Sequence, residues 1–218
     1  MNRPLILLNF KTYPESSGKK AFKMASDLAK VKTKRYHIAI APSTLTLKDI
    51  AEEVNLDVFA QHADPVGLGA HTGSVSPEEL KNLGVKGVIL NHSEHKLKPE
   101  VVSKTIKLCR QNKLAVIGCV SNLEEVKLWA KYMPSFIAYE PQELIGGKIS
   151  VTSVKPEIIL KAVELVKKLS PQTGVLAGAG VHSRNDLAQA LFLGTRGVLI
   201  GHAVPKAKNP RRFLESIL

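Results

Sequence analysis

Eight short apolar runs recur along the chain, and each is followed by a turn and then by a segment with helical periodicity. The runs are LILLNF from Leu5, HIAIA from His37, DVFAQ from Asp57, GVILN from Gly87, LAVIGC from Leu114, FIAYE from Phe136, GVLAGAG from Gly174 and GVLIG from Gly197. They are apolar along nearly their whole length, which is typical of parallel strands covered on both faces. Eight such units close a (β/α)8 barrel, so the sequence predicts this α/β fold. An open, doubly wound sheet is the alternative.

Helical segments fill the intervals between these runs. Ser76, for example, can cap a helix that begins at Pro77, because proline suits the first helical turn. The expected helices are Lys19–Val31, Thr44–Val54, Pro77–Leu83, Pro99–Asn112, Leu123–Lys131, Lys155–Leu169, Arg184–Phe192 and Pro210–Ile217. No Pro-, Gly- or Ser-rich linker interrupts the pattern, so residues 1–218 are expected to form one domain.

The charge of the chain bears on its partners. Lys and Arg number 31 against 19 Asp and Glu, which gives a formal net charge of +12. Such an excess suits a nucleic-acid-binding protein or an enzyme whose field attracts an anionic substrate. The basic residues are scattered through nearly every expected helix, and aromatic residues make up only 5%. We therefore expect solvated helix faces and a small anionic ligand, with no nucleic-acid partner.

Two further features bear on the compartment. No stretch approaches the roughly 18 apolar residues of a membrane span, and the N-terminal apolar run stops at Asn9 and Lys11. The only cysteines, Cys109 and Cys119, fit neither a disulfide framework nor a zinc pattern, which favours structural roles in a reducing compartment. We expect a soluble, cytoplasmic protein without a membrane partner.

Chemically useful side chains follow several of the predicted strands. Lys11, His92 and Glu140 follow the first, fourth and sixth runs, and glycines at 180 and 201 end the seventh and eighth. In either candidate architecture ligands lie beyond the C-terminal ends of the strands. There, lysine can stabilise a developing anion, histidine can move a proton, and glutamate can act as a base. Gly180 and Gly201 allow backbone amides to approach a phosphate.

Four motifs stand at these strand ends in a fixed order: NFKTY from Asn9, NHSE from Asn91, YEPQELIGG from Tyr139 and GAG from Gly178. With them the sequence resembles the triosephosphate isomerase family, in the compact form typical of archaea. The motifs span the chain almost from end to end. The resemblance implies a single TIM barrel that interconverts dihydroxyacetone phosphate and D-glyceraldehyde 3-phosphate through an enediolate, in glycolysis and gluconeogenesis, without metal or organic cofactor.

The resemblance also implies roles for particular residues, and these are the roles general to the family. Glu140 would remove the carbon-bound proton. Neutral His92 would polarise the carbonyl, with a nearby helix N-terminus disfavouring its protonated form. Lys11 would bind the phosphate and stabilise the enediolate, Asn9 would support the same oxyanion region, and Glu94 would be the ion-pair partner of Lys11.

The phosphate would be held by a lid and by two glycine-rich turns. The lid is expected over Pro141–Lys148, closing through an amide near Ile145, and it contains LIGGK where the family often has IGTG. Gly180, Gly201 and the backbone amide of His202 would complete the phosphate site. The GHA turn that contains His202 replaces the small-residue turn usual in the family.

Family members with a trimmed, archaeal-type chain form tetramers assembled from dimers. We therefore expect a homo-oligomer, with a tetramer favoured over a dimer and with trimmed helices after strands four and five. The long loop Gln61–Gly73 would reach a neighbouring subunit. His95 stands near Glu94 where the family often carries arginine. His37, His95 and His182 are assigned to the surface or to turns.

Two other functions remain open at this stage. A metal-dependent pentose-phosphate epimerase would need His and Asp ligands on several strand ends, whereas only His92 and His62 stand at suitable positions. A basic module that binds polyanions on a barrel scaffold would need no Glu140. Activity that survives a chelator argues against the first, and binding that depends on Glu140 argues against the second.

Overall fold

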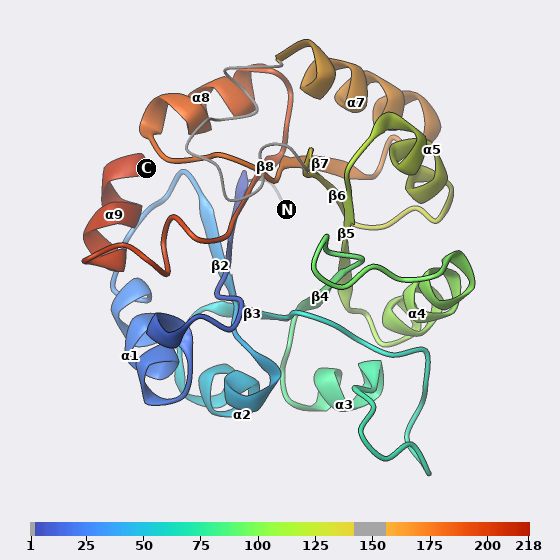
Figure 1. Cartoon of the computed structure of the whole chain (residues 1–218), viewed down its shortest axis with the longest axis horizontal. Coiled ribbons are helices and arrows are strands. Elements are labelled where there is room, and N and C mark those ends of the chain that lie inside the picture. Colours follow the sequence, from blue (N-terminus) through green and yellow to red (C-terminus); the bar gives the residue numbers. More distant parts are fainter. Residues whose placement is uncertain (1–2, 142–155) are drawn as a thin grey trace.

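A computed structural model describes residues 3–141 and 156–218 of the chain. Eight parallel strands follow one another around a closed barrel, and β1 pairs with both β2 and β8 (Figure 1). The strands are β1 Leu5–Asn9, β2 His37–Ala41, β3 Asp57–Ala60, β4 Gly87–Leu90, β5 Ala115–Val120, β6 Phe136–Tyr139, β7 Gly174–Ala177 and β8 Gly197–Ile200. The predicted (β/α)8 barrel is therefore confirmed, and the open sheet is excluded.

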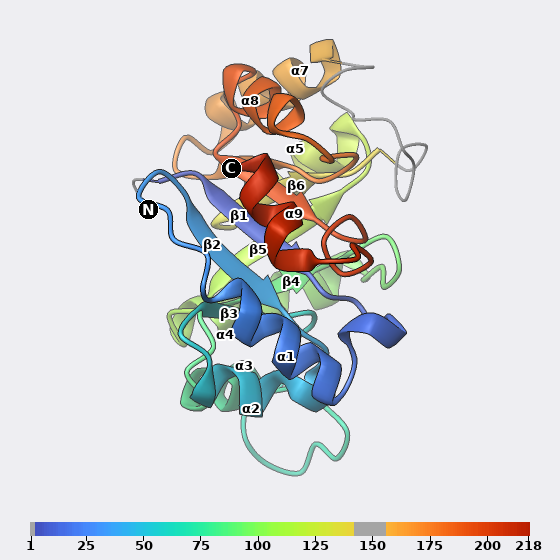
Figure 2. The ribbon, with the colours of Figure 1, turned by 90° about the vertical axis from the view of Figure 1, so that its left-hand side faces the viewer.

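Helices cover the outside of the barrel. They are α1 Lys19–Leu28, α2 Thr44–Glu53, α3 Pro77–Asn82, α4 Pro99–Gln111, α5 Leu123–Lys131, α7 Pro156–Leu169, α8 Arg184–Phe192 and α9 Pro210–Ile217, with a short 3-10 helix, η1, at Pro14–Ser16. The last helix, α9, returns to lie beside α1 (Figure 2). No helix among the described residues is both long and apolar enough to cross a membrane.

One helix prediction needs correction. Helix α1 ends at Leu28 rather than Val31, because the backbone N–H of Val31 bonds the carbonyl of Leu28 and closes a tight turn. Helix α4 has 13 residues and α5 has 9, and the expected trimming of these helices relative to longer family members stays a prediction. Ser76 caps α3 as predicted, accepting a hydrogen bond from the N–H of Glu78.

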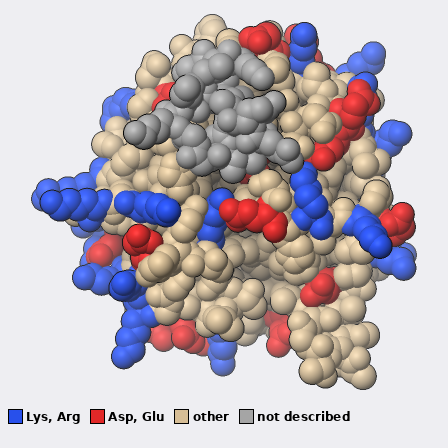
Figure 3. Space-filling model, viewed as in Figure 1, with Lys and Arg blue, Asp and Glu red and all other residues tan. Residues whose placement is uncertain are grey.

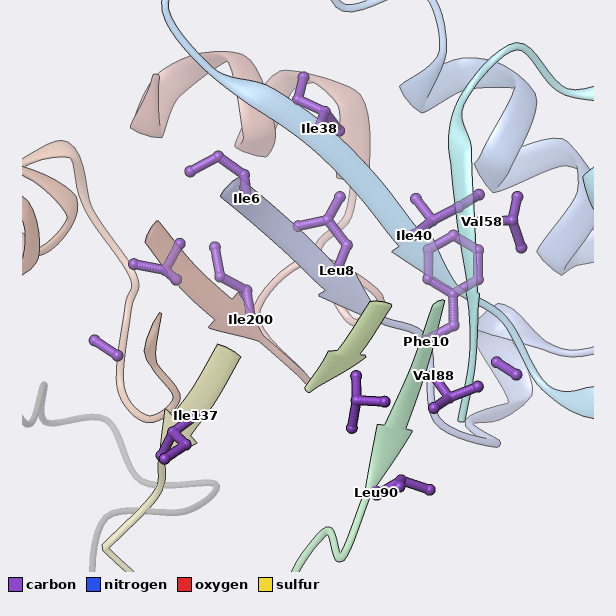
Figure 4. Packing of buried hydrophobic residues seen from close by; sticks show 14 of the residues in the cluster. Ile6, Leu8, Phe10, Ile38, Ile40, Val58, Val88, Leu90, Ile137 and Ile200 are labelled. Carbon is purple, nitrogen blue, oxygen red and sulfur yellow. The ribbon is translucent and has the colours of Figure 1, made fainter. Parts of the chain in front are cut away.

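Alternate residues of the strands build two separate cores. One set points into the barrel, and it consists of Leu5, Leu7, Ala39, Ala41, Phe59, Ile89, Ile117, Cys119, Phe136, Ala138, Leu176 and Leu199. The other set packs between the barrel and the helices. Figure 4 shows part of it, with Ile6, Leu8, Ile38 and Ile40 standing off β1 and β2. Both faces of each strand are thus buried, which explains why the strands read as continuous apolar runs.

Candidate active site

The alternation of the strands selects the residues that face the site. The inward series Leu5, Leu7 continues to Asn9, and the inward series Phe136, Ala138 continues to Glu140. Since the barrel interior is filled by apolar side chains, the first polar residues of each series lie at its C-terminal end. This end of the barrel is therefore lined by functional groups that the strands themselves hold in place.

Lys11 is held at this end by a strained backbone and by two side chains. Its φ of 50° lies in the left-handed region, which is unfavourable for a lysine. Asn9 Oδ1 accepts the Lys11 N–H at 3.0 Å. Gln61 Nε2 donates to the Lys11 carbonyl at 3.1 Å and to the Ala41 carbonyl at 2.9 Å. These bonds offset the strain and fix the direction in which Lys11 leaves β1.

His92 stands in a turn held by Asn91. Asn91 has a φ of 60°, donates from Nδ2 to the Cys119 carbonyl at 2.9 Å, and accepts at Oδ1 from the N–H of Leu97 at 2.9 Å. The N–H of Glu94 donates to His92 Nδ1 at 3.2 Å. Because Nδ1 is an acceptor, the neutral ring carries its proton on Nε2, which lies 3.7 Å from Glu140 Oε2.

Glu140 is a buried carboxylate. Its side chain is 5% exposed, and among the described residues its Oε2 atom has no hydrogen-bond partner. The thiol of Cys119 lies within hydrogen-bonding reach of the carboxylate. Gly178 leaves the space that the side chain needs, because a Cβ at that position would lie 2.3 Å from Glu140 Cγ. A buried oxygen without a partner is available to a ligand.

The surroundings of Glu140 and His92 shift the pKa values of these two side chains in opposite directions. Burial raises the pKa of Glu140 to about 8, against the opposing effects of Lys11 and the Cys119 thiol. Burial and the positive charge of Lys11 lower the pKa of His92 to about 4. Helix α4, the first helix after His92, begins only at Pro99. A neutral imidazole thus faces a carboxyl group poised to exchange a proton near neutral pH.

Glu94 lies where the resemblance placed it, in contact with Lys11. Lys11 Nζ is 2.6 Å from Glu94 Oε1, and the Lys11 side chain is 12% exposed. The neighbouring positions form contacts of their own: the His95 ring stacks on His62 at a centroid separation of 4.4 Å, and Lys96 pairs with Glu125. His95 is exposed, as expected, and its ring stacks on that of His62 beside the site.

The phosphate side of the pocket is formed by the turns after β7 and β8. Gly180, with a φ of 69°, Gly201 and His202 line the same pocket as Lys11 and Glu140. His182, assigned to the surface or to a turn, lies in the turn after β7 and also lines this pocket. The turn after β7 brings His182 to the pocket, and no feature of the sequence indicated this position. Ile145 and the rest of the predicted lid beyond Pro141 lie outside the described residues.

Charges around this end of the barrel are mixed. Figure 3, which views the molecule from this end, shows Lys and Arg spread over the surface among Asp and Glu, without one dominant basic patch. Among the described residues, no three His, Cys, Asp or Glu side chains are grouped so that they could hold a metal ion.

Comparison with known proteins agrees with this geometry. A sequence model of the family described as triosephosphate isomerase matches residues 4–217. The chain belongs to the triosephosphate isomerase family. It is 43% identical to the triosephosphate isomerase of Methanothermus fervidus over all of this chain and 99% of that protein. Identity is 39% to the enzyme of Thermoplasma volcanium, covering 98% of each chain, and 38% to that of Saccharolobus solfataricus, covering 100% and 96%.

Several residues of this family member were not singled out from the sequence. Gln61 and Asn91 support Lys11 and His92 through the hydrogen bonds described above. Cys119, expected to be purely structural, contacts Glu140. The alternation along the strands could have identified Asn91 and Cys119 in the sequence. Both residues belong to the series of alternate positions that face the inside of the barrel.

Proposed function

We propose that the protein interconverts dihydroxyacetone phosphate and D-glyceraldehyde 3-phosphate, with Glu140 as the base, His92 as the electrophile and Lys11 as the cation. The observation that carries this proposal is the juxtaposition of a buried carboxyl group and a neutral imidazole 3.7 Å apart, with Lys11 in the same pocket. Family membership supports this reaction, and the pocket contains the kinds of side chain that the reaction uses.

The first step is removal of a proton from the carbon next to the carbonyl. Glu140 takes this proton in its ionised form, and the C–H bonding pair moves to give an enediolate. Its raised pKa makes the carboxylate a stronger base than an exposed glutamate would be. Gly178 and the end of β6 hold the carboxylate against the pocket, which limits the motion needed for the transfer.

The second step is stabilisation of the enediolate and return of the proton. The Nε2–H of His92 faces the developing oxyanion and moves protons between the two oxygens. Lys11 adds a positive charge to the same region, supported by Asn9 and Glu94. Glu140 then returns a proton to the neighbouring carbon, so the reaction needs no other reagent and no metal or organic cofactor.

The substrate's phosphate lies against the turns at Gly180 and Gly201 and against the backbone of His202. Glycine at both turns lets main-chain N–H groups approach the phosphate oxygens. We propose that the lid of the family corresponds to Pro141–Lys148, of which only Pro141 lies within the described residues, and that its closure through an amide near Ile145 excludes water from the enediolate.

The proposal also covers the domain organisation, the cellular location and the oligomeric state of the protein. We infer one catalytic domain over residues 1–218, a cytoplasmic enzyme of glycolysis and gluconeogenesis, and a homotetramer with a dimer as the smaller alternative. The exposed loop segment 67–73 supports contact with a neighbouring subunit. Light scattering at working concentration is expected to give the tetramer mass, and a dimer mass would contradict that part.

The test of the reaction is nuclear magnetic resonance of the protein with dihydroxyacetone phosphate in heavy water that contains a chelator. Deuterium uptake at the reacting carbon and appearance of the aldehyde are expected together, and both are expected to disappear in Glu140→Gln. If both signals form without the chelator and vanish with it, the metal-free mechanism is contradicted. If neither signal forms in a folded protein, the isomerase assignment fails.

A further inference from the structure

Two histidines meet at the phosphate side of the pocket. His182 follows β7 and His202 follows β8, and their rings lie edge to face with centroids 5.4 Å apart and planes inclined by 62°. Both side chains belong to residues that line the pocket containing Lys11 and Glu140. The turns that bear the phosphate-facing glycines therefore also bring two imidazoles together.

His202 is surrounded by positive charge. Burial lowers the pKa of His202, and His182, Lys11 and Lys206 lower it further. Lys206 is tied to this turn because its N–H bonds the His202 carbonyl at 3.0 Å, and its ammonium group lies 4.4 Å from the centroid of the Tyr13 ring. An anion bound beside this imidazole offsets the neighbouring cations, which raises the pKa of His202 and favours its protonated form.

Among the described residues, the carboxylates near the pocket have contacts of their own. Asp186 Oδ2 accepts hydrogen bonds from the N–H groups of His182 and Ser183 and from the Ser183 hydroxyl, at the start of α8. Glu94 pairs with Lys11. Glu140 is buried beside His92. The side of the pocket formed by the two histidines is consequently suited to an anion.

We propose that His182 and His202 bind the phosphate of the substrate through their imidazoles, and that the pair takes up a proton from water when the phosphate dianion binds. This inference rests on the proposed function, since it concerns the same substrate. The second pKa of a phosphate ester is about 6, so the substrate is mainly a dianion at neutral pH. An imidazolium N–H then forms a charge-assisted hydrogen bond to it. The pair thereby selects the dianion.

Calorimetry with glycerol 3-phosphate tests the proposal, because this ligand carries the phosphate but lacks the carbonyl and cannot isomerise. Titration at pH 7.5 in two buffers of different ionisation enthalpy counts the protons taken up. His182→Gln and His202→Gln are compared with the wild type. His37→Gln is the control, since His37 lies at the opposite end of the barrel, 2.9 Å from Asp57. Proton uptake by Glu140 is common to these proteins and cancels in the comparison.

Each pocket variant is expected to lower the affinity about 10-fold at pH 7.5, the usual effect of losing one hydrogen bond to a charged group, and to reduce proton uptake. The loss is expected to shrink to about 2-fold at pH 9, where imidazoles are neutral. The control is expected to match the wild type. If a pocket variant fails to fold, ring nitrogen chemical shifts of the wild type, with and without glycerol 3-phosphate, report the same protonation.

The outcomes separate this inference from the proposed function. Normal affinity and proton uptake in both pocket variants, or unchanged ring shifts, overturn the histidine site even if the enzyme is active. A wild type that binds glycerol 3-phosphate with proton uptake, but does not convert dihydroxyacetone phosphate, contradicts the isomerase function and leaves the histidine site standing.

Discussion

Replacement of Glu140 by glutamine is expected to stabilise the fold while abolishing isomerisation. The carboxyl group is buried, its Oε2 atom has no hydrogen-bond partner among the described residues, and its pKa is raised from 4.5 to about 8. Glutamine keeps the shape of the side chain and carries no charge. The variant therefore removes the desolvation cost of the carboxylate together with the base.

The sign and size of the effect follow from the pKa. Between pH 4.5 and about 8 the folded protein holds a proton on Glu140 that the unfolded chain has released. The contribution of Glu140 to stability is thus fully present below pH 4.5 and is lost as the pH rises through about 8. At 1.36 kcal/mol per pKa unit the complete loss is about 5 kcal/mol, of which about 4 kcal/mol falls between pH 5 and pH 9.

Urea unfolding between pH 5 and pH 9 measures this effect. The free energy of unfolding of Glu140→Gln, minus that of the wild type, is expected to increase by about 4 kcal/mol across this range. Glu124→Gln is the control, because its side chain is 80% exposed, and its difference from the wild type is expected to stay nearly constant. His92 has the opposite dependence, since its pKa is lowered and its contribution is lost as the pH falls from 6.5 toward 4.

His92 is present in both proteins, so its titration largely cancels in the difference. A difference between Glu140→Gln and the wild type that does not change with pH would refute the reasoning, because it would mean that the carboxyl group titrates alike in the folded and unfolded chains. A variant that is less stable at pH 9 would refute it more strongly, since glutamine would then lack partners that the carboxylate has.

Three further predictions concern catalysis. Below about pH 8, kcat/KM is expected to fall about tenfold per pH unit as Glu140 becomes protonated, and initial rates that stay level from pH 8 to pH 6 would contradict this. Gly178→Ala is expected to lower kcat about 100-fold with little change in KM, because the new Cβ displaces Glu140; steady-state kinetics with normal kcat would exclude this crowding. Gln61→Leu leaves the Lys11 carbonyl without its donor, so urea unfolding is expected to show a loss of about 1–3 kcal/mol and kinetics a higher KM, whereas unchanged values would remove Gln61 from the support of Lys11.

Much of the fold could be predicted from local signals. The apolar runs indicated all eight strands, and α5, α8 and α9 begin and end where expected. Helix starts were clear because Asn122, Ser183 and Asn209 cap the following helices through their side chains. The end of α1 had no comparable signal, since Ala29 and the residues after it are compatible with either helix or turn.

The candidate site was only partly predictable, because its geometry depends on closure of the barrel. Strand-end position and family motifs identified Lys11, His92 and Glu140. Contacts between segments distant in sequence, such as that of His182 with His202, depend on how adjacent turns pack. The raised pKa of Glu140 depends on complete burial, which a residue following a strand does not reveal by itself.

The alternation of inward and outward residues also governs which changes the chain can accumulate. Inserting one residue into β6 before Glu140 would turn that carboxylate toward the helices and bring its neighbour into the pocket. The same insertion in the turn between α1 and β2, at the opposite end of the barrel, would leave every inward position unchanged. Insertions and deletions should therefore be tolerated mainly in the turns that lead from a helix to the next strand. Recombination at those turns should exchange whole strand and helix units and leave each catalytic group in its position.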